Sequence, residues 1–134
     1  GLWVDLHQHT GKPLSILVVD LPSHPKISRM ELAQSLQELI NETGVGEFDL
    51  MVGDFNLTPG SRALKIASGG ARNAFELAGS GWGGTWPGSK AFLRIDHVFA
   101  AKNIELLDAR TFKVGGDHRG IVVTLKVDDA SELP

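Results

Sequence analysis

Residues 28–44 carry the clearest structural signal in the chain, that of an amphipathic helix. Ser28 and Glu31 stand three apart in a capping box, in which a hydroxyl and a carboxylate satisfy the free amides of a helix start. Apolar residues then recur at helical spacing and a glycine follows as a stop signal: Leu32, Leu36, Leu39, Ile40 and Gly44. We therefore predict a helix here, with one apolar face turned to the core.

Short apolar and β-branched runs surround this helix and read as strands. We expect strands at 2–6 and 16–19 that form a hairpin, a buried strand at 48–52, short helices at 61–67 and 73–78, and strands at 93–100, 104–112 and 120–127. This order predicts a layered α+β domain, in which helices cover a mainly antiparallel sheet. With 134 residues the chain is expected to form a single domain, residues 1–134.

Composition excludes several classes of function. The chain has no cysteine, which rules out disulfides, thiolate metal sites and a cysteine nucleophile. A formal net charge of -3 argues against a general nucleic-acid coat, which would need a strongly positive balance. No apolar run approaches the roughly 20 residues that span a bilayer, so we predict no transmembrane segment in this chain. These features predict no compartment.

Three groups of polar residues stand at the ends of predicted strands, where side chains can reach a shared cleft. Asp54 and Asn56 follow a strand and can point to one side of an extended segment, which places a carboxylate beside an amide, although such residues are also common in turns. Asp96 lies within an apolar strand and needs a partner, because burying an unpaired carboxylate is costly. Asp117 and His118 follow two glycines just before the last strand, a pattern that also fits a solvated loop.

The order and local residues of these groups resemble the endonuclease/exonuclease/phosphatase superfamily, which includes deoxyribonuclease I, apurinic endonucleases, sphingomyelinases and inositol-phosphate phosphatases. The matching stretches are Gly53–Asn56, Arg94–Phe99 and Gly116–Arg119, and the segment Gly83–Pro87 is similar to bacterial members. The family fold is a four-layer sandwich about twice as long as this chain. The resemblance therefore implies the C-terminal half of such a domain.

The resemblance also implies a role for each matching residue. Asp54 would orient or deprotonate the attacking water, and Asn56 would bind the scissile phosphate. Asp96 would hydrogen-bond His118 and fix its tautomer, so that His118 can bind or protonate a phosphoryl oxygen. Asp117 would be a ligand of Mg²⁺ or Mn²⁺, hard ions that stabilise the negative charge of the transition state.

The implied substrate is a phosphoester: nucleic acid, phospholipid or sugar phosphate. We expect Thr58, Arg62 and Trp86 to contact it, although a solvated helix-face arginine and a packed tryptophan are the ordinary alternatives for the last two. Trp82 could present its ring to a base, a sugar or a lipid headgroup, but plugging of the sheet edge is favoured for it.

The chain departs from the family at several points. We find no counterpart of the family's first-strand Asn or of its metal-binding Glu, and Asp20 stands where many relatives have a histidine. Asp20 could be a metal-linked carboxylate, but capping of the turn before Pro22 is favoured. His7 and His9 share one face of the first strand, as zinc ligands often do, yet no third ligand except His24 has suitable spacing.

Two readings follow from the missing half. The chain is either a piece of a longer protein, which we favour, or a half-sandwich, and in both cases the N-terminal half of the domain or a second copy is expected to cover its exposed apolar sheet. The alternative function is a catalytically silent binding or assembly module that retains the fold. The absent Glu favours this alternative, whereas the five retained polar residues, Asp54, Asn56, Asp96, Asp117 and His118, argue for an enzyme.

Overall fold

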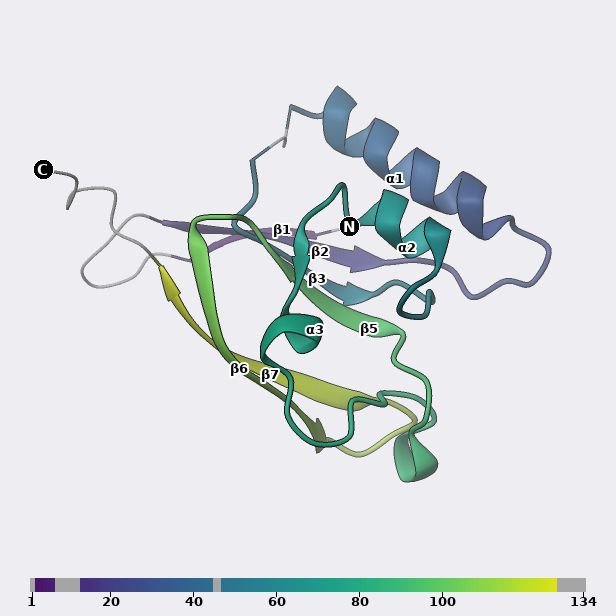
Figure 1. The fold of residues 1–134 in the computed structure, drawn as a ribbon. Coiled ribbons are helices and arrows are strands. Elements are labelled where there is room, and N and C mark those ends of the chain that lie inside the picture. The colour runs from purple at the N-terminus through teal and green to yellow at the C-terminus, as the bar shows by residue number, and fades with distance from the viewer. Residues whose placement is uncertain (1, 7–12, 45–46, 128–134) are drawn as a thin grey trace, which may run out of the picture.

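The computed structural model describes residues 2–6, 13–44 and 47–127, which form three layers. Helices α1 and α2 cover one face of a five-stranded sheet, and a two-stranded sheet lies on its other face (Figure 1). The strands are β1 (Leu2–Leu6), β2 (Leu14–Asp20), β3 (Leu50–Asp54), β4 (Arg72–Asn73), β5 (Asp96–Ala100), β6 (Ile104–Lys113) and β7 (Arg119–Val127). The helices are α1 (Arg29–Glu42), α2 (Arg62–Ala67), α3 (Ala74–Ala78) and the 3₁₀ turn η1 (Gly88–Lys90). The predicted α+β architecture is confirmed.

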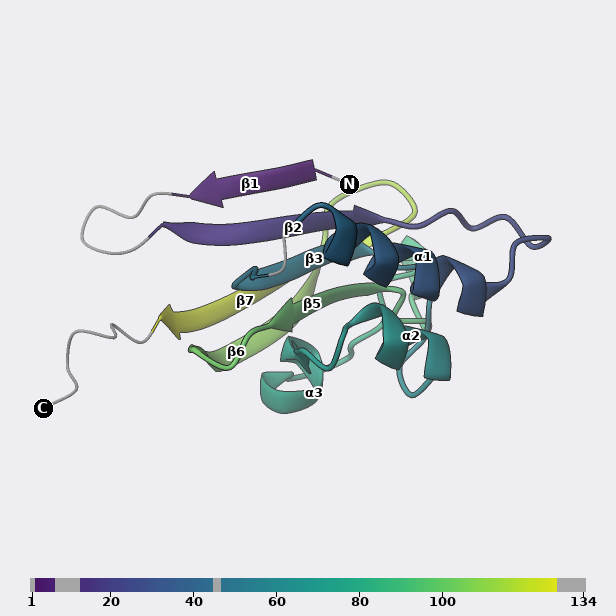
Figure 2. The same cartoon turned by 90° about the horizontal axis from the view of Figure 1, so that it is seen from above.

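The larger sheet has the order β1-β2-β3-β5-β4 and is mainly antiparallel, as expected. The predicted hairpin is present as β1 paired with β2. The one parallel pair described is β2 with β3, and α1 supplies the crossover that parallel strands require (Figure 2). The smaller sheet is the antiparallel pair β6-β7, with a register shift between Leu106 and Asp108.

Helix α1 follows its local sequence signals closely. The Ser28 hydroxyl accepts a hydrogen bond from the amide of Glu31, so this cap satisfies one of the free donors at the helix start. Thr43 caps the other end, and Gly44 adopts a φ of 66° that ends the helix. Ala33 and Ile40 are buried on the face turned to the sheet.

Two apolar clusters hold the layers together. One lies between the larger sheet and helices α1 and α2, with Met51, Phe55 and Phe99 at its centre. The other lies between the two sheets, where buried residues such as Leu50 and Ile104 meet partly buried side chains of β7. Among the residues described, no helix is long and apolar enough to cross a membrane.

Some boundaries differ from the predictions. The strand expected at 93–100 begins at Asp96, because Leu93 instead accepts hydrogen bonds from Thr85 and Trp86 in a separate bridge. The short elements β4 and η1 were not predicted, since two or three residues show no periodicity. Helices α2 and α3 occur where expected, capped by Ser61 and Asn73.

Candidate active site

Three carboxylates come together where β2, β3 and β5 lie side by side. In the strand registers Asp20 pairs with Asp54, and Asp54 pairs with Asp96. Burial raises the pKa of Asp54, and the charges of Asp96 and Asp20 raise it further, against the backbone hydrogen bond of Asn56 and the charge of His118. The proton affinity of Asp54 is therefore higher than that of an ordinary aspartate.

His118 reaches these carboxylates from the smaller sheet. Gly115 and Gly116, with φ of 82° and 85°, turn the chain ahead of β7, which begins one residue after the histidine. His118 Nδ1 lies 2.8 Å from Asp96 Oδ2, and its Nε2 lies 4.0 Å from Asp54 Oδ2. The expected pairing of Asp96 with His118 is thus present, and it directs Nε2 toward Asp54.

The carboxylates also change the charge state of this imidazole. Partial burial lowers the pKa of His118, but the hydrogen bond to Asp96 and the charges of Asp96, Asp54 and Asp117 outweigh it, so the pKa is raised. The imidazolium is therefore populated to a higher pH than for a free histidine. Such a cation beside carboxylates can bind or protonate an anionic oxygen.

Thr85 connects the segment that carries Asp96 to the segment that carries His118, a role that the sequence did not reveal. Its side chain is fully buried, and its hydroxyl accepts hydrogen bonds from the amides of Ile95 and Asp96. Its carbonyl accepts a hydrogen bond from the Arg119 amide, one residue beyond His118. The start of β5 and the start of β7 are consequently tied to one residue.

Asn56 lies beside Asp54, but not in the extended conformation considered from the sequence. Its φ is 49°, and its amide donates to Asp54 Oδ1 at 2.8 Å, an arrangement that holds the carboxylate in place. Its side-chain Nδ2 donates to the carbonyl of Leu21 at 2.6 Å. Asn56 thereby ties the loop after β3 to the end of β2.

His97 points away from this cluster and belongs to the core. It is 1% exposed, and its Nε2 donates to the Leu57 carbonyl at 2.8 Å while Nδ1 accepts from Asn73 Nδ2 at 3.1 Å. Burial lowers the pKa of His97 to about 4. The neutral ring therefore anchors the loop that carries Asn56.

The other expected site residues lie at varying places. Asp117 is exposed next to His118, and its carbonyl accepts from the Gly88 amide at 2.5 Å. Thr58 is exposed at the rim of a hollow with Trp82 and Arg94, and Trp86 is partly buried. Arg62 is exposed at the start of α2, along a different hollow that Asn73 and Glu76 also line.

The predictions for the histidine pair and for Trp82 can also be compared with the structure. His7 and His9 lie outside the described residues, and His24 is exposed, with its Nδ1 accepting from the Lys26 amide. The preferred interpretation of Trp82 as a plug of the sheet edge is wrong, because 64% of this residue is exposed.

One group in the described part of the chain has the spacing of metal ligands. It consists of Asp54, Asp96 and His118, whose ligating atoms all lie within 4.8 Å of one another. Two carboxylates and an imidazole suit Mn²⁺ and, with added water and substrate oxygens, Mg²⁺. Asp117, the ligand implied by the resemblance, lies next to this group in sequence but is not part of it.

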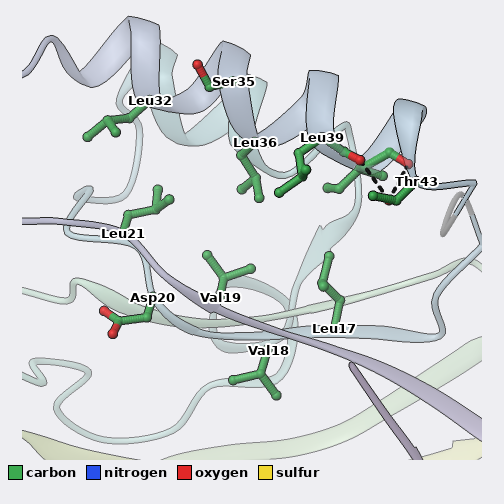
Figure 3. Close-up of a pocket in the computed structure, with 11 residues that line it drawn as sticks. Leu17, Val18, Val19, Asp20, Leu21, Leu32, Ser35, Leu36, Leu39 and Thr43 are labelled. Atoms are coloured by element: carbon green, nitrogen blue, oxygen red, sulfur yellow. Dashed lines mark hydrogen bonds between the residues drawn. The ribbon is translucent and has the colours of Figure 1, made fainter. Parts of the chain in front are cut away.

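An apolar groove of about 380 Å³ lies between α1 and β2 (Figure 3). Leu32, Leu36 and Leu39 line it from the helix, and Leu17 and Val19 line it from the strand. Asp20 is its charged lining residue. Its composition fits apolar contact and not catalysis.

Comparison with known proteins identifies the relatives of this chain. A model of the Endonuclease/Exonuclease/phosphatase family matches residues 10–125. No curated protein sequence matches the chain significantly.

Solved structures with the same fold include the following three proteins. A functionally unknown conserved protein from Enterococcus faecalis is 17% identical, with a TM-score of 0.77 over 94% of this chain and 55% of that one. A mannosyl-6-phosphatase from Bacteroides thetaiotaomicron is 21% identical, with a TM-score of 0.68 over 87% of this chain and 52% of that one. The human Nocturnin catalytic domain with bound sulfate is 20% identical, with a TM-score of 0.63 over 90% of this chain and 49% of that one. The chain thus spans about half the length of these structures.

Proposed function

This chain belongs to the endonuclease/exonuclease/phosphatase family, and from that premise we propose that it carries the part of a phosphoester hydrolase that activates water and binds the phosphate. The observation that carries the proposal is the contact between the two sheets, in which His118 lies 2.8 Å from Asp96 and 4.0 Å from Asp54. Histidine held by one carboxylate and facing another is an arrangement suited to acid–base work on an anionic substrate.

The distance between Asp54 and His118 supports a shared ligand oxygen. At 4.0 Å their facing atoms are too far apart for a good hydrogen bond. An oxygen at about 2.8 Å from both atoms would subtend an angle of about 90°, which a water or a phosphoryl oxygen tolerates. Asp54 would then orient and deprotonate the attacking water, and the imidazolium of His118 would donate a hydrogen bond to the phosphate.

The remaining residues of the cluster position Asp54 and His118 or contact the substrate. Asp96 accepts a hydrogen bond from Nδ1 of His118 and so directs Nε2 of the imidazole toward the substrate. The Asn56 amide holds the Asp54 carboxylate, and we assign to the free portion of its side chain a contact with the phosphate. Thr58 and Trp86 remain proposed substrate contacts, and so does Arg62, at the start of α2.

The donor set fits a divalent cation. The carboxylates of Asp54 and Asp96 would hold Mg²⁺ or Mn²⁺, with Asp117 as a further carboxylate beside them, while His118 keeps its proton for the phosphate. A bound ion of this kind supplies positive charge that neutralises the phosphate and lowers the pKa of water. Dependence on Mg²⁺ or Mn²⁺ is accordingly part of the proposal.

The substrate class follows from charge and from the relatives. The net charge of -3 disfavours a long polyanion and favours a small phosphoester. One similar structure is a mannosyl-6-phosphatase, in keeping with a sugar phosphate as substrate. Nucleic acid and phospholipid are the competing substrates.

We also assign the chain, residues 1–134, to a single domain that forms part of a larger sandwich. The apolar cluster between the two sheets, in which the side chains of β7 are only partly buried, is where the N-terminal half of such a domain, or a second copy, would pack. Sedimentation of the chain distinguishes a second copy, which gives a dimer, from a missing segment.

Hydrolysis of bis-p-nitrophenyl phosphate and p-nitrophenyl phosphate with Mg²⁺ or Mn²⁺ tests the function. We expect turnover that is lost in Asp54→Ala and His118→Gln and retained in His24→Gln, which changes an exposed histidine elsewhere. The same pair of substitutions is made in the longest native chain that contains this sequence. Absence of turnover in both chains with either substrate would favour the silent binding module.

A further inference from the structure

A hollow of about 330 Å³ is lined in part by the segment that follows β3 and the segment that precedes β5, the two strands that carry Asp54 and Asp96. Beyond the paired residues Asp54 and Asp96 the Phe55 amide still donates to the Ile95 carbonyl, and farther along Thr58 lines the hollow on one side while Arg94 lines it on the other. Arg94 is two residues from Asp96, so its backbone lies roughly 7 Å from the cluster at the spacing of extended residues. A group attached to a phosphate at Asp54 and His118 can therefore reach this hollow.

Trp82 forms one wall of the hollow and is exposed without being loose. Its Nε1 donates to the Ala91 carbonyl, and its own carbonyl accepts from Thr111 Oγ1 at 2.8 Å. A Cβ at Gly84 would lie 2.8 Å from Trp82 Nε1, so the indole needs glycine at that position. The indole is held through Nε1 and the backbone through its carbonyl, although 64% of the residue faces solvent.

Phe92 adds a second exposed aromatic ring to the same hollow. It is 62% exposed and follows Ala91, the residue that accepts the Trp82 hydrogen bond. The exposure of two large apolar side chains to water at one hollow is unfavourable, because no packing in the core offsets it. A held aromatic surface of this kind is suited to stacking against the face of a ligand ring.

Arg94 decides which kind of ring fits, because it is the charged residue among those that line the hollow. Its guanidinium is already engaged, 3.7 Å from Glu76 and 4.6 Å from the centre of the Phe75 ring. The charge of Arg94 is thus already paired with Glu76, although its Nε has no hydrogen-bond partner among the described residues. The chemistry of the hollow matches an uncharged ring, with the Thr58 hydroxyl at the rim for a polar substituent.

We propose that Trp82 and Phe92 form a specificity subsite that stacks on an uncharged ring, of a sugar or a nucleobase, carried by the phosphoester substrate. The proposal rests on the hydrolase function above, since the ring belongs to the group esterified to the bound phosphate. It narrows the substrates to small ring-bearing phosphoesters. A ringless phosphoester would use the phosphate site alone.

Calorimetric titration of the chain in EDTA, where no turnover occurs, tests the subsite with three phosphomonoesters. Glucose 6-phosphate carries a sugar ring, AMP carries a base, and glycerol 3-phosphate carries no ring. We expect at least one ring-bearing ligand to bind about tenfold more tightly than glycerol 3-phosphate, a difference of the size that aromatic stacking provides. The ligand that is preferred identifies the ring.

Variants assign the preference to the two aromatic side chains. Trp82→Ala and Phe92→Ala are each expected to remove most of the preference, whereas Trp82→Phe keeps a ring and part of it. Leu77→Ala is the matched control, since Leu77 is 60% exposed on α3 and does not line the hollow. Equal affinities for all three ligands, or a preference that survives both alanine variants, would overturn the proposal.

Turnover of glycerol 3-phosphate with Mg²⁺ or Mn²⁺ is measured in parallel and separates the two ideas. Turnover of this ligand without any ring preference would refute the subsite and leave the hydrolase function intact. A ring preference that depends on Trp82, in a chain that hydrolyses none of the three ligands, would support the subsite as a binding site and count against the hydrolase.

Discussion

Protonation of His97 is expected to destabilise the fold that carries the active-site loop. The ring is 1% exposed, it donates to Leu57 and accepts from Asn73, and its pKa is lowered from 6.5 to about 4 by burial. The charges that face it are Arg94, which lowers the pKa, and Asp96, which raises it. Because the folded pKa is depressed, the stabilisation is complete above pH 6.5 and is lost as the pH falls toward 4.

The magnitude follows from the size of the shift. A shift from 6.5 to about 4, at 1.36 kcal/mol per unit, corresponds to about 3 kcal/mol. Urea unfolding of the wild type and of His97→Gln at several pH values isolates this histidine from the carboxylates that titrate in the same range. The stability advantage of the wild type should shrink by about 3 kcal/mol between pH 7 and pH 4.

Two controls make this measurement decisive. His24→Gln removes an exposed histidine and is expected to share the acid sensitivity of the wild type. The ring of His97 can also be followed directly by NMR, where it should remain neutral at pH 6. Parallel wild-type and His97→Gln curves, or titration of the folded ring near 6.5, would refute the reasoning.

Three further substitutions test the geometry of the site. Asp96→Asn removes a charge that raises the pKa of His118, so NMR titration should show a lower pKa for this histidine. The alkaline limb of the pH–activity profile should then move to lower pH, and kcat should fall on the order of 10²–10⁴-fold. An unchanged His118 titration would contradict this. Thr85→Val removes the acceptor of the Ile95 and Asp96 amides, and denaturant unfolding should show a loss of roughly 1–3 kcal/mol per unpaired amide, while Thr85→Ser stays near the wild type. Gly53→Ala would place a Cβ 3.0 Å from the carbonyl carbon of Val19 at a φ of 136°, so a loss of at least about 3 kcal/mol is expected, and wild-type stability would show that β2 and β3 can separate there.

The parts of the fold that were predicted from the sequence are those specified by local signals. Helix α1 begins after Ser28 because a hydroxyl three residues before a glutamate can cap it whatever the tertiary structure. The hairpin of β1 and β2 and the strand β3 likewise appear in short apolar runs. Element β4 has two residues, Arg72 and Asn73, and exists because β5 lies beside it. Such a pairing leaves no pattern in the segment itself.

The site shows the same division between local and long-range information. The pairing of Asp96 with His118 was expected from resemblance to a family, and its distance in the structure agrees. Asn56 was considered in an extended segment, but a hydrogen bond to Leu21, thirty-five residues away, accompanies its left-handed conformation. Thr85 was noted as part of a family-like stretch without a role, since its partners become visible only when β5 and β7 are placed together.

The candidate active site is a contact between two sheets, and this makes its geometry sensitive to packing far from it. Asp54 and Asp96 belong to the larger sheet, whereas His118 precedes β7 of the smaller one. The sheets are joined by an apolar cluster in which the side chains of β7 are only partly buried. Thr85 is the polar tie that bonds to both sheets beside the site. A segment or a second copy that completed the cluster would therefore tighten the approach of His118 to Asp54 without touching either residue.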